Sequence, residues 1–157
     1  MAFYIFLIRP IILSCLCSVF SFAQGARHVK WHHASTPLSI NEALLTLTAE
    51  VKPTWHLYSQ NLKEGGPQPT RIRFDNGNEY YLAGNVQEIG QGNTYYDSVY
   101  EMEITWYCGV VRFIQKIKLN QPSFIKGTVE YMICDNQVCI PSLHEFNIHV
   151  SPQIKTH

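Results

Sequence analysis

One stretch of the sequence reads Thr128-Val129-Glu130-Tyr131-Met132-Ile133-Cys134 and alternates apolar side chains along its length. Successive side chains of a β-strand point to opposite faces, so this pattern predicts a strand with one buried face. If the odd-numbered positions from Val129 to Ile133 face a core, Cys134 lies on the outward face with Met132. We therefore expect a strand that ends in an accessible cysteine.

The same alternation recurs through the sequence, and no stretch keeps a helical period beyond about a turn. Gln115 is the one polar break in these inward sets. Short strands joined by Gly, Asn and Pro turns predict an all-β fold, an antiparallel β-sandwich. The inward positions would be Leu45, Leu47, Ala49 and Val51; Tyr100, Met102, Ile104 and Trp106; Val111, Phe113, Ile117 and Leu119; Phe146, Ile148 and Val150.

Glycine-rich stretches predict where the strands are interrupted. The segments Lys63–Pro69 and Gly90–Asn93 read as loops, and Tyr107–Val110 reads as a tight hairpin in which Gly109 supplies a positive φ.

The N-terminal residues 1–23 read as a secretory signal peptide, with Arg9 before an apolar run, Ile11–Phe22, and a small-residue cleavage site ending at Ala23. A membrane anchor is the alternative, but a spanning helix needs roughly 20 apolar residues. Attachment of a lipid at Cys15 is a second, minor alternative. We expect a periplasmic or secreted protein with no membrane span after cleavage and a single domain at residues 24–157.

Charge and cysteine content narrow the classes of function. Removing residues 1–23 takes one of 12 basic residues and none of the 12 acidic ones, which leaves 11 − 12 = −1. A net charge so close to zero does not indicate the basic surface that binds nucleic acid or a membrane surface. Cys108, Cys134 and Cys139 remain, and in an oxidising compartment they suggest one disulfide and one thiol.

Cys134 and Cys139 enclose the short loop Asp135-Asn136-Gln137-Val138. A disulfide that closes a loop of 15 residues stabilises a protein by an estimated ~3 kcal/mol, because it lowers the entropy of the unfolded chain, and a shorter loop gives less. Stabilisation of the fold is therefore a weak reason to expect a disulfide here. Thiol–disulfide exchange and a structural staple both stay open. The negative charge of Asp135 disfavours a thiolate at Cys134. Cys139 instead lies between the apolar residues Val138 and Ile140, which suit the docking of a partner. We expect Cys139 to form a mixed disulfide with a partner and Cys134 to resolve it.

Metal binding is the rival chemistry, because seven histidines accompany the three cysteines. Structural zinc sites usually pair their ligands at tight C-x-x-C or H-x-x-x-H spacing, and no second cysteine pair exists in the mature chain, so we expect neither a metal nor another cofactor. Cys108 would lie about 7 × 3.3 Å, roughly 23 Å, from the start of its strand. If that start lies beside the cysteine pair, Cys108 is an exposed turn thiol at the opposite end of the sandwich.

Two aromatic segments could surround the cysteine pair. Tyr95, Tyr96, Asp97 and Tyr100 belong to one segment, which is either strand packing or a lid that shields the disulfide. Tyr58 belongs to the second segment, Trp55–Gln60, which is either a core strand or a wall of the site. We expect Trp55 to pack in the core, and Tyr58 could take either place.

Several stretches together make a family pattern: Trp55-His56-Leu57-Tyr58-Ser59-Gln60, Glu64-Gly65-Gly66-Pro67, Phe113–Leu119, and Gly127–Cys134 continued by Cys139-Ile140-Pro141 and Glu145-Phe146. Together they resemble the amino-terminal periplasmic domain of the disulfide reductase DsbD, over nearly the whole mature chain. The resemblance implies an immunoglobulin-like sandwich with Cys134 and Cys139 as the redox pair, a cap loop at Asn93–Tyr100 and Tyr58 lining the site.

The resemblance also implies a function: thiol–disulfide exchange as an oxidoreductase that passes electrons to or from thioredoxin-like periplasmic proteins. Four residues separate the cysteines, where the proteobacterial form has five. The membrane-embedded and thioredoxin-like domains of the family are not in this sequence, so a membrane-embedded or separate reductase would supply the electrons. The alternative is a non-catalytic immunoglobulin-like interaction domain with a structural disulfide.

Overall fold

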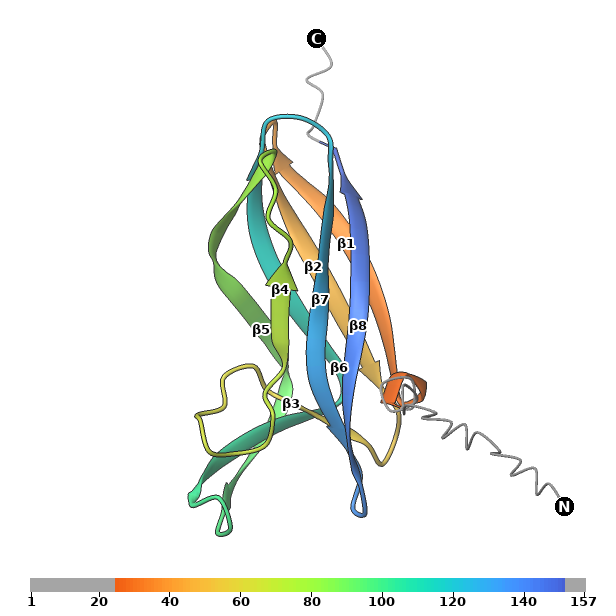
Figure 1. Ribbon diagram of the computed structural model, residues 1–157, viewed down its shortest axis with the longest axis vertical. Helices are drawn as coiled ribbons and strands as arrows, with labels where there is room; N and C mark the ends of the chain where they lie inside the picture. The colour runs from red at the N-terminus through yellow and green to blue at the C-terminus, as the bar shows by residue number, and fades with distance from the viewer. Residues whose placement is uncertain (1–24, 152–157) are drawn as a thin grey trace, which may run out of the picture.

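The alternating stretches form eight β-strands in the computed structural model, which describes residues 25–151 (Figure 1). All strand pairings are antiparallel. The predicted signal peptide and Cys15 lie outside the described residues. After a short 3₁₀ turn, η1 (Gly25–Arg27), the strands are β1 (Val29–Ser39), β2 (Glu42–Val51), β3 (His56–Tyr58), β4 (Arg71–Phe74), β5 (Tyr80–Asp97), β6 (Met102–Leu119), β7 (Ser123–Cys134) and β8 (Cys139–Val150).

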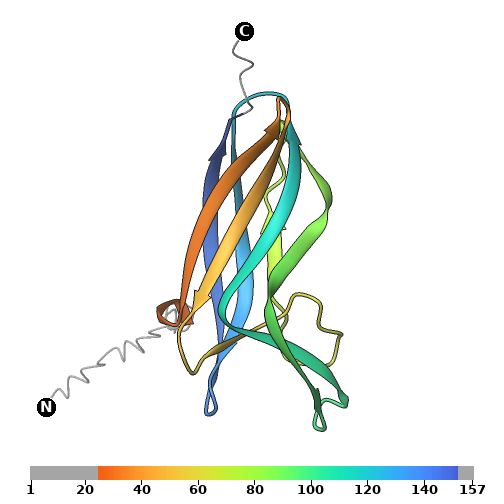
Figure 2. The ribbon, with the colours of Figure 1, turned by 180° about the vertical axis from the view of Figure 1, so that it is seen from behind.

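The strands make two layers that are joined by the short strand β3. One layer has the order β1-β2-β6-β5, and the other has the order β8-β7-β4. Figures 1 and 2 show these layers from their opposite sides. β3 pairs with β6 on one edge and with β7 on the other, so it connects the layers at one end of the sandwich. The predicted antiparallel β-sandwich is confirmed.

The core lies between the layers and is built from the inward positions of the long strands. Buried members include Leu45 and Leu47 of β2, Phe113 of β6 and Phe146 of β8, as the alternation predicts. Gln115 is also buried, and its side-chain amide donates to the carbonyl oxygens of Gly84 and Lys116. These hydrogen bonds satisfy the amide and explain how one polar residue fits an apolar row.

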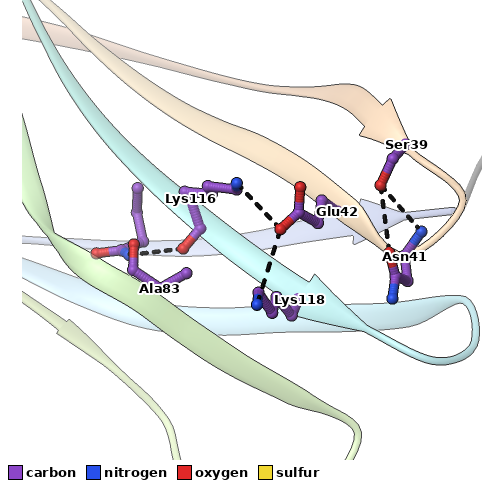
Figure 3. A network of polar contacts seen from close by, with 7 residues as sticks. Ser39, Asn41, Glu42, Ala83, Lys116 and Lys118 are labelled. Atoms are coloured by element: carbon purple, nitrogen blue, oxygen red, sulfur yellow. Dashed lines mark hydrogen bonds and ion pairs between the residues drawn. The ribbon is translucent and has the colours of Figure 1, made fainter.

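A polar network (Figure 3) holds the β1–β2 turn against β6, at the end of the sandwich away from β3 (Figure 1). The carboxylate of Glu42 lies 3.0 Å from Lys116 Nζ and 3.9 Å from Lys118 Nζ. Asn41 also accepts a backbone hydrogen bond from Leu119. Short connections and these local contacts therefore close this end of the sandwich. The longer connections between strands lie at the opposite end.

Two turns expected from glycine are instead interior parts of strands. Gly90–Asn93 lies inside β5, where a Cβ on Gly90 would come within 3.0 Å of the ring of Tyr107. Glycine there permits close approach of strand to side chain and does not mark a turn. The segment Tyr107–Val110 lies inside β6, so the predicted hairpin is wrong. Gly109 does have a positive φ of 69°, as expected.

Gly109 marks a bend at which β6 changes partner. Before it, Trp106 and Tyr107 pair with β3, and from it onward the strand pairs with β2. The register with β5 also shifts between Gly90 and Gly92. The first half of β6 therefore leaves the main layer and forms a projecting hairpin with the end of β5. The predicted loop at Lys63–Pro69 is confirmed as a connection without strand structure.

Two hairpin tips lie at the same end of the molecule. The tip between β5 and β6 and the tip between β7 and β8 both project away from the end of the sandwich at which β8 ends (Figures 1 and 2). The described residues contain no helix with the length and hydropathy that a membrane span requires.

Candidate functional site

A disulfide closes the β7–β8 hairpin. Cys134 and Cys139 form the last pair of the β7–β8 ladder, with an S–S distance of 2.03 Å and a Cα–Cα distance of 4.1 Å. The turn between them is ordered by Asp135, whose Oδ1 accepts hydrogen bonds from the backbone N–H groups of Gln137 and Val138, each at 2.8 Å. These bonds lower the pKa of Asp135. An ionised carboxylate therefore stands beside Cys134 at neutral pH.

The two bonded cysteines have different exposure. Cys134 is only 1% exposed, although it lies on the outward face of β7 with Met132 as expected. Cys139 is exposed. The expectation that the whole pair is accessible is thus wrong for Cys134, because further strands cover that face of β7. Only Cys139 is open to another protein in this state.

The cover over Cys134 is a small second core. Cys134 is buried with Tyr58 of β3 and Ile104 of β6, and the half-buried side chains Leu62, Met102, Trp106 and Met132 pack against them. Met102, Ile104 and Trp106 all come from the projecting half of β6. The cover over Cys134 therefore comes from the strand that follows the predicted aromatic lid, while the lid residues Tyr95, Tyr96 and Tyr100 are themselves exposed.

Tyr58 forms a wall of this second core. Its neighbour Leu57 is fully buried in the main core, so Tyr58 points to the opposite face of β3, toward Cys134. Burial is the main cause that raises the pKa of Tyr58 to about 12, and Tyr95, Tyr100 and Asp97 add to it. The hydroxyl is therefore protonated at neutral pH and can donate a hydrogen bond.

The four predicted cap residues occupy the β5–β6 tip. Asp97 organises it, since its Oδ1 accepts from the backbone N–H groups of Val99 and Tyr100 and its Oδ2 accepts from the Tyr95 hydroxyl. The backbone hydrogen bonds lower the pKa of Asp97. Tyr95, Tyr96 and Tyr100 are all exposed. The tip is thus a structured turn with an exposed aromatic surface.

Two cavities flank this hairpin and are lined by the three cap tyrosines. Tyr95 lines a cavity of about 550 Å³ together with Asn136 of the cysteine loop. Tyr96 and Tyr100 line a second cavity of about 610 Å³, together with Leu62 from the loop after β3. The first cavity lies directly beside the disulfide turn.

Cys108 lies at the site end and not at the opposite end of the sandwich. It lines the same 550 Å³ cavity as Asn136, and its thiol donates to the carbonyl oxygen of Trp55 at 3.3 Å. The expected placement is wrong because the start of β6 is at the projecting tip; six residues along the strand bring the chain back level with the cysteine pair. Burial raises the pKa of the Cys108 thiol, which is nevertheless an exposed residue.

His56 is a site residue that the sequence analysis did not single out. It pairs directly with Cys134 across β3 and β7, and its ring lines the same cavity as Cys108. Period-two alternation could have found it, because a buried Leu57 puts His56 on the same face as Tyr58.

Two histidines elsewhere in the described part of the chain lie close together. Nε2 of His33 and Nε2 of His144 lie 3.1 Å apart, across β1 and β8. His32 and His149 lie on these same two strands. Within residues 25–151, no three histidine, cysteine, aspartate or glutamate side chains gather as a set of metal ligands.

Comparison with known proteins adds a family and two similar structures. The family model described as thiol:disulfide interchange protein DsbD, N-terminal, matches residues 28–150. The crystal structure of the N-terminal periplasmic domain of ScsB from Proteus mirabilis is 18% identical, with a TM-score of 0.58 over 80% of this chain. This chain spans only 48% of that one. No curated protein sequence matches the chain.

The second structure is the N-terminal domain of DsbD from Neisseria meningitidis in the reduced form. It is 14% identical, with a TM-score of 0.52, and the match covers 82% of this chain and 94% of that one. At these identities the likeness establishes the fold. The sandwich is immunoglobulin-like, as expected.

Proposed function

Because the chain belongs to the family of DsbD N-terminal domains, we propose that it exchanges electrons with partner proteins through Cys134 and Cys139. The partners are thioredoxin-like proteins on one side and a membrane-embedded or separate reductase on the other. The observation that carries this proposal is the unequal exposure of the bonded cysteines, one buried and one open. A staple needs no such difference, whereas exchange needs one sulfur that meets a partner and one that is kept for resolution.

The exchange runs in two balanced steps. A thiolate of the reduced partner attacks Cys139 Sγ, the Cys134–Cys139 bond breaks, and its electron pair leaves on Cys134 Sγ, which takes up a proton. A second partner thiolate then attacks the partner's own sulfur in the mixed disulfide and releases Cys139 as a thiolate. Two electrons pass from the partner to the domain, and the reverse sequence passes them to the next protein.

The hairpin tips supply the docking surface for these partners. Val138 is 48% exposed beside Cys139, and Val99 is 85% exposed at the tip of the other hairpin, on the same end of the molecule. Exposed apolar side chains beside a reactive sulfur suit a transient protein contact. We assign residues 1–23 to a secretory signal, which would bring the domain to the periplasm or outside the cell.

The test is the reduction potential of the cysteine pair, measured by equilibration with glutathione buffers and alkylation mass spectrometry. We expect a value of roughly −180 to −270 mV, the range of exchange proteins, and little change in stability on reduction. A value below about −300 mV with marked destabilisation would instead make the bond structural and the chain an immunoglobulin-like interaction domain.

A further inference from the structure

His56 stands beside the buried cysteine in a geometry that the exchange reaction can use. It is the direct cross-strand partner of Cys134, and both side chains point away from the main core. Side chains of directly opposite residues have Cβ atoms about 4.5–5.5 Å apart. The side chains of His56 and Cys134 are therefore direct neighbours on the site face of β3 and β7.

Neighbouring side chains hold the imidazole in place. Its Nε2 lies 3.4 Å from the Tyr58 hydroxyl, and its ring packs on Trp106 with a centroid distance of 4.9 Å. The chain enters β3 through Thr54, whose φ of 70° is uncommon for a β-branched residue. A side chain fixed by two aromatic rings and a constrained entry is suited to repeated proton transfer at one position.

The charges around the ring leave it neutral and able to accept a proton. Burial is the main cause that lowers the pKa of His56, and the carboxylate of Asp135 partly opposes it. The other titratable groups that face the cavity or ring are the hydroxyls of Tyr58 and Tyr95 and the thiol of Cys108. Their raised pKa values keep all three uncharged at neutral pH.

Cys134 needs such a base when it acts as a nucleophile. Burial among apolar side chains and the adjacent Asp135 carboxylate both disfavour a thiolate at this position. The nucleophile in disulfide exchange is nevertheless the thiolate. The proton of Cys134 must therefore pass to a nearby acceptor as the sulfur attacks.

We propose that the imidazole of His56 is the base that takes this proton when Cys134 attacks a mixed disulfide at Cys139. The inference rests on the exchange function proposed above. The S–H bond of Cys134 breaks and its proton moves to the imidazole, a bond forms between Cys134 Sγ and Cys139 Sγ, and the bond from Cys139 to the partner sulfur breaks. The partner leaves as a thiolate with two more electrons. In the reverse direction the imidazolium returns the proton to Cys134.

The experiment follows the resolving step with 5,5′-dithiobis(2-nitrobenzoate), in protein carrying Cys108→Ser to remove the third thiol. The reduced protein releases one nitrothiobenzoate when Cys139 reacts and a second when Cys134 resolves the mixed disulfide. The rate of the second release is measured from pH 5 to 10 in the otherwise unaltered protein and in His56→Gln. His144→Gln is the matched control, because His144 is also half-buried and packs on an aromatic ring, Trp31.

At pH 7 we expect His56→Gln to slow the second release about 10²-fold, within the usual range for general base catalysis. The first release and the control should be unchanged. The protein that retains His56 should keep a level rate from about pH 7 to 8.5, whereas His56→Gln should rise about tenfold per pH unit, as attack by a free thiolate does. The two rates should meet at high pH.

Equal second-phase rates in His56→Gln and His144→Gln at pH 7 would overturn the inference. So would a difference of constant size at every pH, since that is the mark of a purely structural role. If His56→Gln fails to fold, the pH dependence of the second release in the protein that keeps His56 is still a test. A tenfold rise in that rate per pH unit would rule out His56 as the base. A reduction potential in the exchange range together with a negative result here rejects His56 alone; a potential in the structural range rejects the exchange function itself.

Discussion

Cys134 and Cys139 share one bond but have opposite surroundings. Cys139 begins β8 next to Val138 at an exposed turn, while Cys134 is enclosed by Tyr58 and Ile104. A partner thiolate approaching from solvent can reach only the exposed sulfur in line with the S–S bond. In the proposed exchange, the buried sulfur is therefore assigned as the leaving group in one direction and as the resolving nucleophile in the other.

This asymmetry predicts different behaviour of the single-cysteine variants in a Cys108→Ser background. Cys134→Ser leaves the exposed Cys139 unresolved and should accumulate a stable mixed disulfide with a reactive disulfide partner or with oxidised glutathione. Cys139→Ser leaves only the buried Cys134 and should react at least about tenfold more slowly, because access and thiolate formation are both impaired. Mass spectrometry of time-resolved quenched samples measures both rates. Equal rates would show that burial of Cys134 does not direct the exchange.

At the scale of elements, the projecting half of β6 is what separates this site from an ordinary sandwich edge. The strand turns out of the main layer at Gly109, pairs with β3 and places Ile104 over Cys134. The tip of this hairpin carries exposed side chains such as Val99, whereas Ile104 and Tyr107 nearer its base are buried. The projecting hairpin therefore buries Cys134 near its base and leaves its tip exposed to solvent.

Replacing Ile104 with alanine tests this protection. Ile104 is fully buried, so Ile104→Ala should lower the free energy of unfolding by about 2–5 kcal/mol. In the reduced protein it should also speed alkylation of Cys134 by iodoacetamide. Val99→Ala, at an exposed position of the same hairpin, should change stability by no more than about 0.5 kcal/mol and leave alkylation unaltered. Urea unfolding and alkylation mass spectrometry measure the two effects, and unchanged alkylation in Ile104→Ala would contradict a protective role.

At the scale of the whole molecule, the sandwich is closed along β1 and β8 by side chains and not by a strand ladder. His144 of β8 stacks on Trp31 of β1 and shares a hydrogen bond with His33. Ser35 of β1 also donates to the carbonyl oxygen of His149 at 3.3 Å. Burial is the main cause that lowers the pKa of both His33 and His144; the charge of His32 also lowers the pKa of His33, and that of His33 lowers the pKa of His144. This seam favours neutral imidazoles.

The seam predicts a pH dependence of stability. Because the folded-state pKa values of His33 and His144 lie below the unfolded value of about 6.5, the unfolded state binds more protons as the pH falls through that value. Stability should therefore decrease from about pH 6.5 downward until the lower folded-state pKa values are passed, and these residues should add no slope above about pH 7.5. Urea unfolding between pH 5 and 8 should show a smaller decrease in His144→Gln than in the exposed-site control His149→Gln. Identical slopes would show that the seam does not sense pH.

Much of this architecture follows from the sequence alone. The alternation in residues 45–51, 111–119 and 146–150 identified the inward faces of three strands, because the two-residue period of a strand is a local property. The disulfide between Cys134 and Cys139 and the placement of Tyr58 against it also agree with expectation. Residue type, spacing and family motifs were sufficient for these features.

Other features depended on which strands meet in space. Alternation put Cys134 on an outward face, but only the packing of β3 and the first half of β6 decides that this face is covered. The glycines at 90 and 109 look like turns locally, yet one lets β5 pass close to Tyr107 and the other bends β6 between two partners. The same bend brings Cys108 to the cavity beside His56. Periodicity determined the faces of the strands, whereas burial, partner exchange and the assembly of the site arise from long-range pairing, which no local pattern contains.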